Sequence, residues 1–297
     1  MFSRITFVIT IFNALALVKA GADTDHCYAL ALSGGGTNAV WESGVFWGLT
    51  HYGNPDDFKY DVVTGISGGS INTGMISLFA IGDEVNASEK IAEIYKSLKQ
   101  SDLIREWDGG LVEGLFFQAG IMDNTPGYEF GQQIYQHYTE TKRRYVITAN
   151  DANTGAYTKF TDQNIPFTDL VDAIIASSSV PFVFPPHHYN GTYFIDGGST
   201  WNINLDSAIQ RCLEIVDDPS KITLDVMICG DENLNTTATI DNSAYGNFLR
   251  NKDIHDYFVN YDSIYQEMEA SPTVNYRYLF EEHDKASGEA ELNFNGD

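Results

Sequence analysis

Two strand–turn–helix patterns that follow each other directly constrain the fold more than any other feature of this chain. Residues 27–32 are apolar and end in a run of glycines, and residues 40–49 then carry apolar side chains at helical spacing. Residues 60–64 form a second apolar run that ends in another glycine-rich turn, and a second helical segment follows. Strands joined through a helix in this way lie parallel with a right-handed crossover. The sequence therefore predicts an α/β fold with a central, mostly parallel β-sheet flanked by helices.

The rest of the chain continues the alternation of strands and helices. Helices are predicted over residues 89–100, 170–178 and 245–268, and strands over residues 144–150, 157–160, 193–195 and 223–229. No repeat, low-complexity tract or linker rich in proline and glycine interrupts the 297 residues. We therefore expect a single domain over residues 21–297, with its core motifs in residues 28–205 and a divergent C-terminal part in residues 206–297.

Composition and charge exclude several classes of function. Hydrophobic residues make up 43% of the chain and aromatic residues 13%, which is enough to build a packed core. The net charge of −24 excludes general electrostatic binding of nucleic acid, because such binding needs a surplus of lysine and arginine. The same charge argues against general adsorption to anionic membranes, although it leaves a local contact with lipid open.

The first twenty residues have the pattern of a secretory signal peptide. Arg4 supplies a basic start, residues 5–18 carry no charge, and Val18-Lys19-Ala20 has the small residues that precede a cleavage site. The uncharged stretch is too short to span a bilayer, which takes about 20 residues. We therefore expect a mature chain that begins at Gly21 and lies outside the cell or in the lumen of the secretory or vacuolar pathway. The alternatives are an uncleaved anchor and a buried first strand.

Sequons and cysteines agree with that location. Three Asn-x-Ser/Thr patterns are candidate glycosylation sites, at Asn86, Asn190 and Asn235. The three cysteines of the chain allow at most one internal disulfide. We favour the pair Cys212–Cys229, because a helix that leads into the next strand could bring these two residues together, which leaves Cys27 unpaired.

The glycine-rich turn after residues 60–64 contains a candidate nucleophile. It has the Gly-x-Ser-x-Gly pattern of a tight strand-to-helix turn that exposes a serine at the top of a sheet. The serine is Ser67, and the glycines of this turn are Gly65, Gly68 and Gly69. Glycines suit such a turn because it is strained and because side chains would block the approach of a substrate. An ordinary glycine-rich turn is the alternative interpretation.

Two more segments carry candidate site residues. Gly34, Gly35 and Gly36 follow a buried strand and leave backbone N–H groups free, which suits an oxyanion hole or a phosphate cradle. They lack the Gly-Lys-Ser/Thr end of a P-loop. Asp196 closes an apolar strand and precedes Gly197 and Gly198. A plain Asp-Gly turn is the commoner interpretation of that tripeptide.

Taken together and in this order, these segments resemble the patatin-like phospholipase family. Its members have G-G-G-x-R/K-G, then G-x-S-x-G, then A-S-x-A-P-x-x-F-P, then D-G-G/A, and the corresponding residues here are 34–39, 65–69, 176–185 and 196–198. The resemblance covers roughly residues 28–205. This chain departs from the pattern at Asn38, which replaces the basic residue, at Ala39, and at Asn202-Ile203-Asn204, which stands where Asn-Asn-Pro is usual.

The resemblance implies a patatin-like fold and a lipid acyl hydrolase of the phospholipase A type. Ser67 would be the nucleophile and Asp196 the proton acceptor of a dyad without histidine, with Gly34, Gly35 and Gly36 as the oxyanion hole. A carboxylate can fill that role if it is partly desolvated and within hydrogen-bond reach of the serine. The implied partners are an acyl lipid and, transiently, a membrane or lipid surface; no cofactor or metal is implied.

An apolar acyl channel is a further expectation. It would draw on residues 116–117, 121–122 and 182–184, each of which could equally belong to the ordinary core.

Two other functions stay open at this point. A Ser–Asp–His triad of the α/β-hydrolase type would use His255 or His283, which follow Ser67 in the chain. A catalytically silent secreted lipid-binding protein is the other. His187-His188 lies in a loop and forms no convincing metal site, since the chain offers no cluster of ligands around it.

Overall fold

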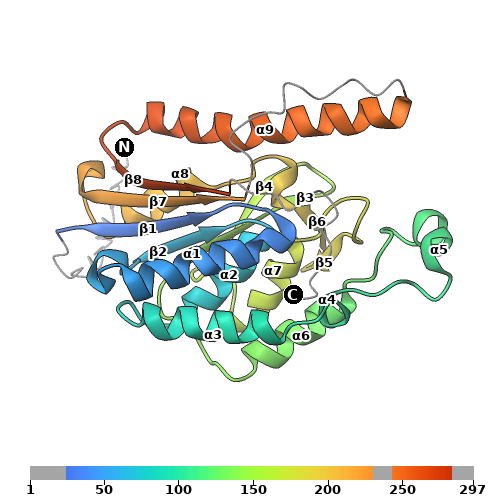
Figure 1. Ribbon diagram of the computed structural model, residues 1–297, viewed down its shortest axis with the longest axis horizontal. Coiled ribbons are helices and arrows are strands. Elements are labelled where there is room, and N and C mark those ends of the chain that lie inside the picture. The colour runs from blue at the N-terminus through green and yellow to red at the C-terminus, as the bar shows by residue number, and fades with distance from the viewer. Residues whose placement is uncertain (1–24, 230–242, 283–297) are drawn as a thin grey trace, which may run out of the picture.

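A computed structural model describes residues 25–229 and 243–282, and its strands join one mixed β-sheet between layers of helices (Figure 1). The strand order is β5-β6-β3-β2-β1-β7-β8, and β4 pairs with β3 outside this path. The strands are β1 (Cys27–Leu32), β2 (Val62–Gly65), β3 (Arg144–Asp151), β4 (Tyr157–Thr161), β5 (His187–Tyr189), β6 (Thr192–Asp196), β7 (Ile222–Ile228) and β8 (Asn275–Glu281). The helices are α1 (Ala39–Tyr52), α2 (Gly68–Ser77), α3 (Glu84–Ser97), α4 (Gln100–Leu103), α5 (Gly110–Phe117), α6 (Thr125–Tyr135), α7 (Leu170–Ser177), α8 (Leu205–Cys212) and α9 (Ala244–Ala270).

The centre of the sheet is parallel and one side of it is antiparallel. Strand β1 pairs in parallel with β2 and β7, β2 with β3, and β7 with β8. Strands β4 and β6 pair antiparallel with β3, and β5 pairs antiparallel with β6. The predicted α/β fold class is therefore confirmed. Because β1 and β2 are parallel neighbours, the two glycine-rich turns that follow them meet at one edge of the sheet.

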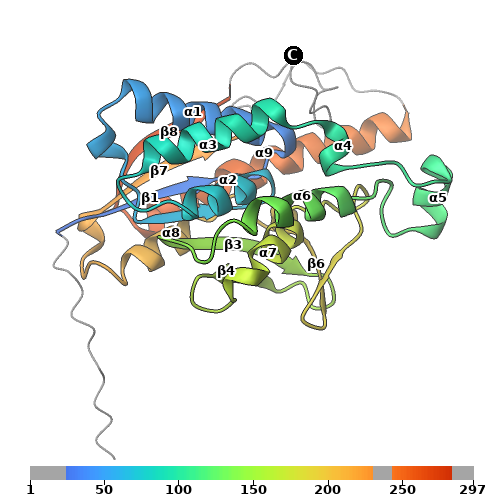
Figure 2. The same ribbon diagram turned by 90° about the horizontal axis from the view of Figure 1, so that it is seen from below.

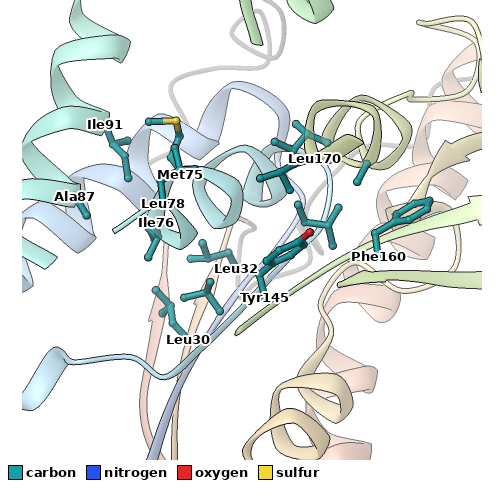
Figure 3. Packing of buried hydrophobic residues seen from close by; sticks show 14 of the residues in the cluster. Leu30, Leu32, Met75, Ile76, Leu78, Ala87, Ile91, Tyr145, Phe160 and Leu170 are labelled. Atoms are coloured by element: carbon teal, nitrogen blue, oxygen red, sulfur yellow. The ribbon is translucent and has the colours of Figure 1, made fainter. Parts of the chain in front are cut away.

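Strand β1 shows how the two faces of the sheet are filled. Leu30 and Leu32 belong to a buried cluster together with residues of α1, α2, α3 and α7 (Figure 3). Ala29 and Ala31, which alternate with the leucines, belong to a second cluster with α8 and the inner face of α9. Successive side chains of a strand point to opposite faces, so burial on both faces makes the whole strand apolar.

Most predicted elements are found, with shifted ends. The helix expected at residues 89–100 spans Glu84–Ser97, and the one expected at residues 245–268 spans Ala244–Ala270. Strand β8 was not among the predicted elements, although Tyr276, Tyr278 and Phe280 occupy alternate positions in it, which is the spacing of a strand with one apolar face.

The predicted disulfide is wrong. Cys27 pairs with Cys212, with their Cα atoms 5.6 Å apart, and Cys229 is free and buried. Helix α8 packs under β1 and ends beside the start of that strand, where Cys27 lies next to Ile222 of β7. Cys229 follows the far end of β7, seven residues on, which is about 23 Å at the rise of a strand.

Residues 25–229 and 243–282 contain neither a membrane-spanning helix nor a cluster of metal ligands. No helix in those ranges is long and apolar enough to cross a membrane. Nor do they contain a group of three or more histidine, cysteine or acidic side chains arranged to hold a metal ion.

Candidate active site

Ser67 lies in a strained turn between β2 and α2. Its φ is +51°, in the left-handed region, and its side chain is only 6% exposed. A serine held in that region costs roughly 1–2 kcal/mol, so packing has to enforce the conformation. Part of that packing is a hydrogen bond of 2.9 Å from the N–H of Ser67 to the Oγ of Ser177, at the end of α7.

The glycines of this turn are explained by close approach of the backbone. A side chain on Gly65 would collide with the carbonyl of Gly69, and one on Gly69 would collide with the carbonyl of Ser33. A Cβ on Gly68 would lie 2.6 Å from the carbonyl oxygen of Gly36. The turn after β2 is therefore pressed against the turn after β1, and only glycine fits at the contacts.

Asp196 ends β6 and reaches the same place from the antiparallel side of the sheet. Its N–H donates to the carbonyl of Ser179 over 2.9 Å, and its Oδ1 accepts from the N–H of Gly198 over 2.7 Å. Its Oδ2 is buried and accepts no hydrogen bond of normal geometry from the described residues. Burial raises the pKa of Asp196 to about 6, and the neighbouring Ser67 hydroxyl and the Gly198 amide offset part of that rise. The structure thus brings Ser67 and Asp196 together in a site largely closed to solvent.

Gly34 forms two hydrogen bonds with Asn202, which the other two glycines of its loop do not. The N–H of Gly34 donates to the carbonyl of Asn202 over 2.9 Å, and the Asn202 side chain donates back to the carbonyl of Gly34 over 2.8 Å. The Cα of Gly34 faces Ser67, since a Cβ there would lie 3.1 Å from the Cβ of Ser67. Its own N–H is therefore not available to an oxyanion, although we expected it to be.

Gly35 and Gly36 keep their N–H groups free. Within the described residues, neither group donates a hydrogen bond to protein. Gly36 has a φ of +57°, which glycine adopts without strain. Gly35 rests on Cys229, whose side chain fills the space that a Cβ on Gly35 would need. The N-terminal end of α2 faces this loop, so the loop lies in the positive field of a helix dipole.

Several residues that hold this site were not found by sequence reasoning. Ser177 and Ser179 bind the backbone of Ser67 and Asp196, respectively. The side chain of Asn150, at the end of β3, donates to the carbonyl of Asp196 over 2.9 Å and accepts from Thr200. The serines lie within the third family motif, and Asn202 lies in the segment that stands where Asn-Asn-Pro is usual, which were the available signals; Asn150 had none.

A polar cluster is buried behind the glycine loop. Glu42 of α1 is 1% exposed, its Oε2 accepts a hydrogen bond of 3.1 Å from Asn72, and its Oε1 has no partner among the described residues. Burial raises the pKa of Glu42 to about 8, against smaller lowering contributions from Asn72 and Cys229. Glu42 is therefore protonated at neutral pH. The thiol of Cys229 donates to the carbonyl of Asn38 over 3.4 Å, which links this cluster to the loop.

Comparison with known proteins places the chain in a family. The sequence profile described as patatin-like phospholipase matches residues 30–209. The chain belongs to this family. The probable lipid hydrolase 463L of Invertebrate iridescent virus 6 is 26% identical over 189 residues, which are 61% of this chain and 63% of the viral protein. This chain thus spans less than two thirds of the length of that relative.

A solved structure is also similar to this patatin-like chain. The crystal structure of VipD from Legionella pneumophila matches with a TM-score of 0.40 and 11% identity, over 72% of this chain and 52% of VipD.

The position at which this patatin-like chain departs from the family pattern has a local partner. The side chain of Asn38 donates a hydrogen bond of 2.7 Å to Glu282, which directly follows β8. The loop is thus held by a hydrogen bond between Asn38 and an acidic residue, and no positive charge stands at this position.

Three of the side chains expected in the acyl channel face solvent. Phe116 and Phe117 are 75% and 79% exposed on α5, and Phe182 is 67% exposed, so these three side chains belong neither to the core nor to an enclosed channel. The reason is that α5 stands away from the rest of the protein (Figures 1 and 2).

The histidines occupy different surroundings. His255 lies on an exposed part of α9 and lines a cavity of about 390 Å³ together with Thr200 and Trp201. His187 bonds Asp172 over 2.9 Å. His283 lies outside the described residues, as do the predicted signal segment, residues 1–20, and the sequon at Asn235.

The other two sequons lie on the surface. Asn86 is exposed in the first turn of α3, and Asn190 is exposed at the tip of the turn between β5 and β6.

Proposed function

We propose that this protein is a lipid acyl hydrolase of the phospholipase A type, which cleaves fatty-acyl esters through an acyl-Ser67 intermediate. The observation that carries the proposal is the pairing of a strained, buried Ser67 with a buried Asp196 that has one unbonded carboxylate oxygen. A structural aspartate would normally have both oxygens bonded, because a buried unpaired acceptor costs about 1–3 kcal/mol. Membership of the patatin-like phospholipase family and the likeness to a probable lipid hydrolase support the same activity.

The first half of the reaction follows from this geometry. The Oγ of Ser67 attacks the acyl carbonyl while Asp196 takes the serine proton, and the proton then passes to the departing alcohol. A pKa of about 6 leaves Asp196 ionised at neutral pH and makes it a better base than an exposed carboxylate. Water then attacks the acyl-serine with Asp196 as base again, which releases the fatty acid and restores Ser67.

The oxyanion that forms in each half would be held by the free N–H groups of Gly35 and Gly36. Loss of one such donor typically costs about 2.7–4 kcal/mol of transition-state stabilisation. Gly34 acts differently in this proposal: its two hydrogen bonds with Asn202 hold the loop in place, and the next two N–H groups remain free of protein acceptors among the described residues. No metal or cofactor takes part.

The test is the release of fatty acid from phospholipids, galactolipids and triacylglycerols by the wild-type protein and by Ser67→Ala. We expect release from at least one lipid class, a loss of about a thousandfold or more in the variant, and labelling by a fluorophosphonate probe at Ser67 alone. A folded protein that binds these lipids, releases no fatty acid and takes up no probe would instead be a silent lipid-binding protein.

A location in the secretory pathway is part of the proposal. The disulfide Cys27–Cys212 supports it, since such bonds persist in oxidising compartments, and the exposed Asn86 and Asn190 are accessible to glycans. We expect the purified protein to begin at or near Gly21 and to shift on gels after deglycosylation. An N-terminal sequence that starts at Met1 would contradict this location.

A further inference from the structure

Helix α5 carries an exposed apolar surface. The helix projects from one end of the molecule, clear of the other helices (Figures 1 and 2). Five of its eight residues are large, apolar and between 42% and 79% exposed: Leu111, Val112, Leu115, Phe116 and Phe117. At about 100° per residue these side chains spread over about 240° of the helix circumference. An exposed apolar patch of this kind marks a binding surface.

The base of α5 is firmly braced, so the helix is held at a fixed place. Arg105 and Asp123 pair through two backbone hydrogen bonds of 3.0 and 2.9 Å and through a side-chain ion pair of 2.7 Å. The indole N–H of Trp107 donates to the carbonyl of Gly120 over 2.9 Å. A Cβ on Gly114 would lie 2.7 Å from the Cα of Ile121, so the helix packs closely on residues 118–123, the segment that leads back from α5 to the body of the protein.

The same segment, residues 118–123, connects α5 with the stretch of chain that holds the active site. Ile121 and Met122 donate backbone hydrogen bonds of 3.0 and 2.9 Å to the carbonyls of Phe182 and Val183. Phe182 is 67% exposed and has a φ of +73°, a conformation in which a large side chain is strained. A few residues earlier, Ser177 and Ser179 hold the backbone of Ser67 and Asp196. The exposed apolar residues of α5 and Phe182, together called the apolar tip here, are thus joined to the active site by one short stretch of chain.

The negative charges around this tip determine which lipid surfaces it can bind. Glu106 and Asp108 are exposed beside α5, and Glu113 on the helix keeps a lowered pKa because Gln118 and the Gly109 amide bond its carboxylate. The whole chain has a net charge of −24. An anionic bilayer would repel these charges, whereas zwitterionic or uncharged head groups would not.

We propose that α5 and Phe182 form a lipid-docking tip that inserts into membranes or lipid particles with zwitterionic or uncharged head groups, and so holds the Ser67 site at the lipid surface. A protein groove covers one stripe of a helix, whereas fluid acyl chains can surround a convex tip whose apolar side chains point in several directions. This proposal rests on the proposed lipid hydrolase activity, because it assigns the surface from which that site draws its substrate.

The test separates binding from catalysis by using the full chain with Ser67→Ala, which cannot consume the lipid. Sedimentation with phosphatidylcholine vesicles measures binding of this protein, of the same protein with Phe116→Ser and Phe117→Ser, and of a control with Tyr52→Ser. Tyr52 is 84% exposed at the end of α1, so the control removes an equally exposed aromatic side chain far along the chain from α5.

We expect the double variant to bind phosphatidylcholine vesicles at least tenfold more weakly and the Tyr52→Ser control to bind within twofold of the parent. The parent should bind mixed phosphatidylcholine–phosphatidylserine vesicles severalfold more weakly than phosphatidylcholine alone, with the difference shrinking as salt is added. Equal binding by all three proteins, or no binding by the parent, would overturn the proposal. So would a concentration-dependent dimer that the two phenylalanines support in the absence of lipid.

A water-soluble short-chain ester distinguishes this proposal from the proposed function. With Ser67 restored, the double phenylalanine variant should hydrolyse that ester within about twofold of the wild-type rate, and its activity on vesicles should fall as its binding does. An equal loss on both substrates would place the two phenylalanines in an acyl channel and overturn the docking tip. Lack of all hydrolysis with intact vesicle binding would overturn the proposed function alone.

Discussion

Ser67 and Phe182 both have positive φ without being glycine, at +51° and +73°, yet their surroundings are opposite. Ser67 is 6% exposed and lies in a turn whose glycines allow the backbones of two loops to touch. Phe182 is 67% exposed, and its carbonyl and that of Val183 accept backbone hydrogen bonds from residues 121 and 122, just after α5. Asn190 is the third such residue in the described chain, and there an Asn-Gly hairpin turn explains the conformation.

The buried Ser67 and the exposed Phe182 therefore suit different tasks. Around Ser67 the interior holds the backbone, because Ser177 accepts a hydrogen bond from Ser67 and Ser179 accepts one from Asp196. At Phe182 the backbone is fixed but the side chain is left in water, which costs the favourable burial that a phenylalanine normally has. A chemical step needs the first arrangement, whereas a reversible contact with lipid needs the second.

The largest effect that we expect is the loss of hydrolysis when the buried Asp196 is replaced. Asp196→Asn keeps the size of the side chain but removes the base, so hydrolysis of soluble and lipid esters should fall together by about a thousandfold or more. His255→Ala should change kcat by less than about tenfold, because a dyad uses no imidazole. Steady-state kinetics measure both, with circular dichroism to show that each variant is folded.

A loss of about a thousandfold in His255→Ala would restore the Ser–Asp–His alternative. Near-normal turnover by Asp196→Asn would remove Asp196 from the chemistry altogether.

The buried Glu42 should make the free energy of unfolding of the protein depend on pH. Between about pH 4.5, where the unfolded chain loses this proton, and about pH 8, where the folded protein does, only the folded state keeps the proton. The free energy of unfolding therefore falls as pH rises from the lower to the upper end of this window, by about 4 kcal/mol. Glu42→Gln should remove this fall, as measured by urea unfolding at the two ends of the window.

The exposed Glu93→Gln on the neighbouring helix α3 is the matched control and should leave the pH dependence as it is in the wild type. If Glu42→Gln had the same slope as the control, Glu42 would be ionised in the folded protein.

The acid limb of the activity profile should show the burial of Asp196. Because its pKa is raised to about 6, kcat/KM on a soluble ester should fall about tenfold per pH unit below that value, or about a hundredfold by pH 4. The limb should persist in His255→Ala and should shift little with temperature, because carboxyl ionisation has almost no enthalpy change, unlike that of imidazole. A limb near the ordinary carboxyl value of about 4 would contradict the buried base.

The smallest effect that we expect is on the free energy of unfolding when the exposed Phe182, with its strained backbone, is replaced. Phe182→Gly relieves about 1 kcal/mol of backbone strain but adds a similar entropy to the unfolded chain, so the free energy of unfolding should change by less than about 1 kcal/mol. Vesicle binding should nevertheless fall severalfold.

Asn190→Gly, at an equally exposed residue with positive φ, should change neither stability nor vesicle binding. A loss of vesicle binding in both variants would mean that surface glycines, and not the loss of the Phe182 side chain, weaken docking.

Short sequence patterns predicted a large part of this structure. Apolar runs that end in glycines identified β1, β2 and the helices after them, because buried parallel strands have no polar face. Ser67 and Asp196 were singled out from short motifs, and the structure brings their side chains together. Helix α5 was not predicted, because an exposed helix has no buried face to impose a period on its residues. Strand β8 was also missed, although its aromatic residues alternate and Tyr276 and Phe280 pack against the core.

The fold class, the order of the motifs and the candidate nucleophile and base could be predicted from the amino-acid sequence, since they depend on neighbours in the chain. The disulfide partner of Cys27, 185 residues away, and the hydrogen bonds of Asn202 to Gly34, 168 residues away, became known from the three-dimensional structure. It also shows that Phe116 and Phe117 face water. Sheet register and the packing of α8 and α5 set these contacts. An apolar residue has the same identity in a core and on a protruding tip, so its role follows from what surrounds it.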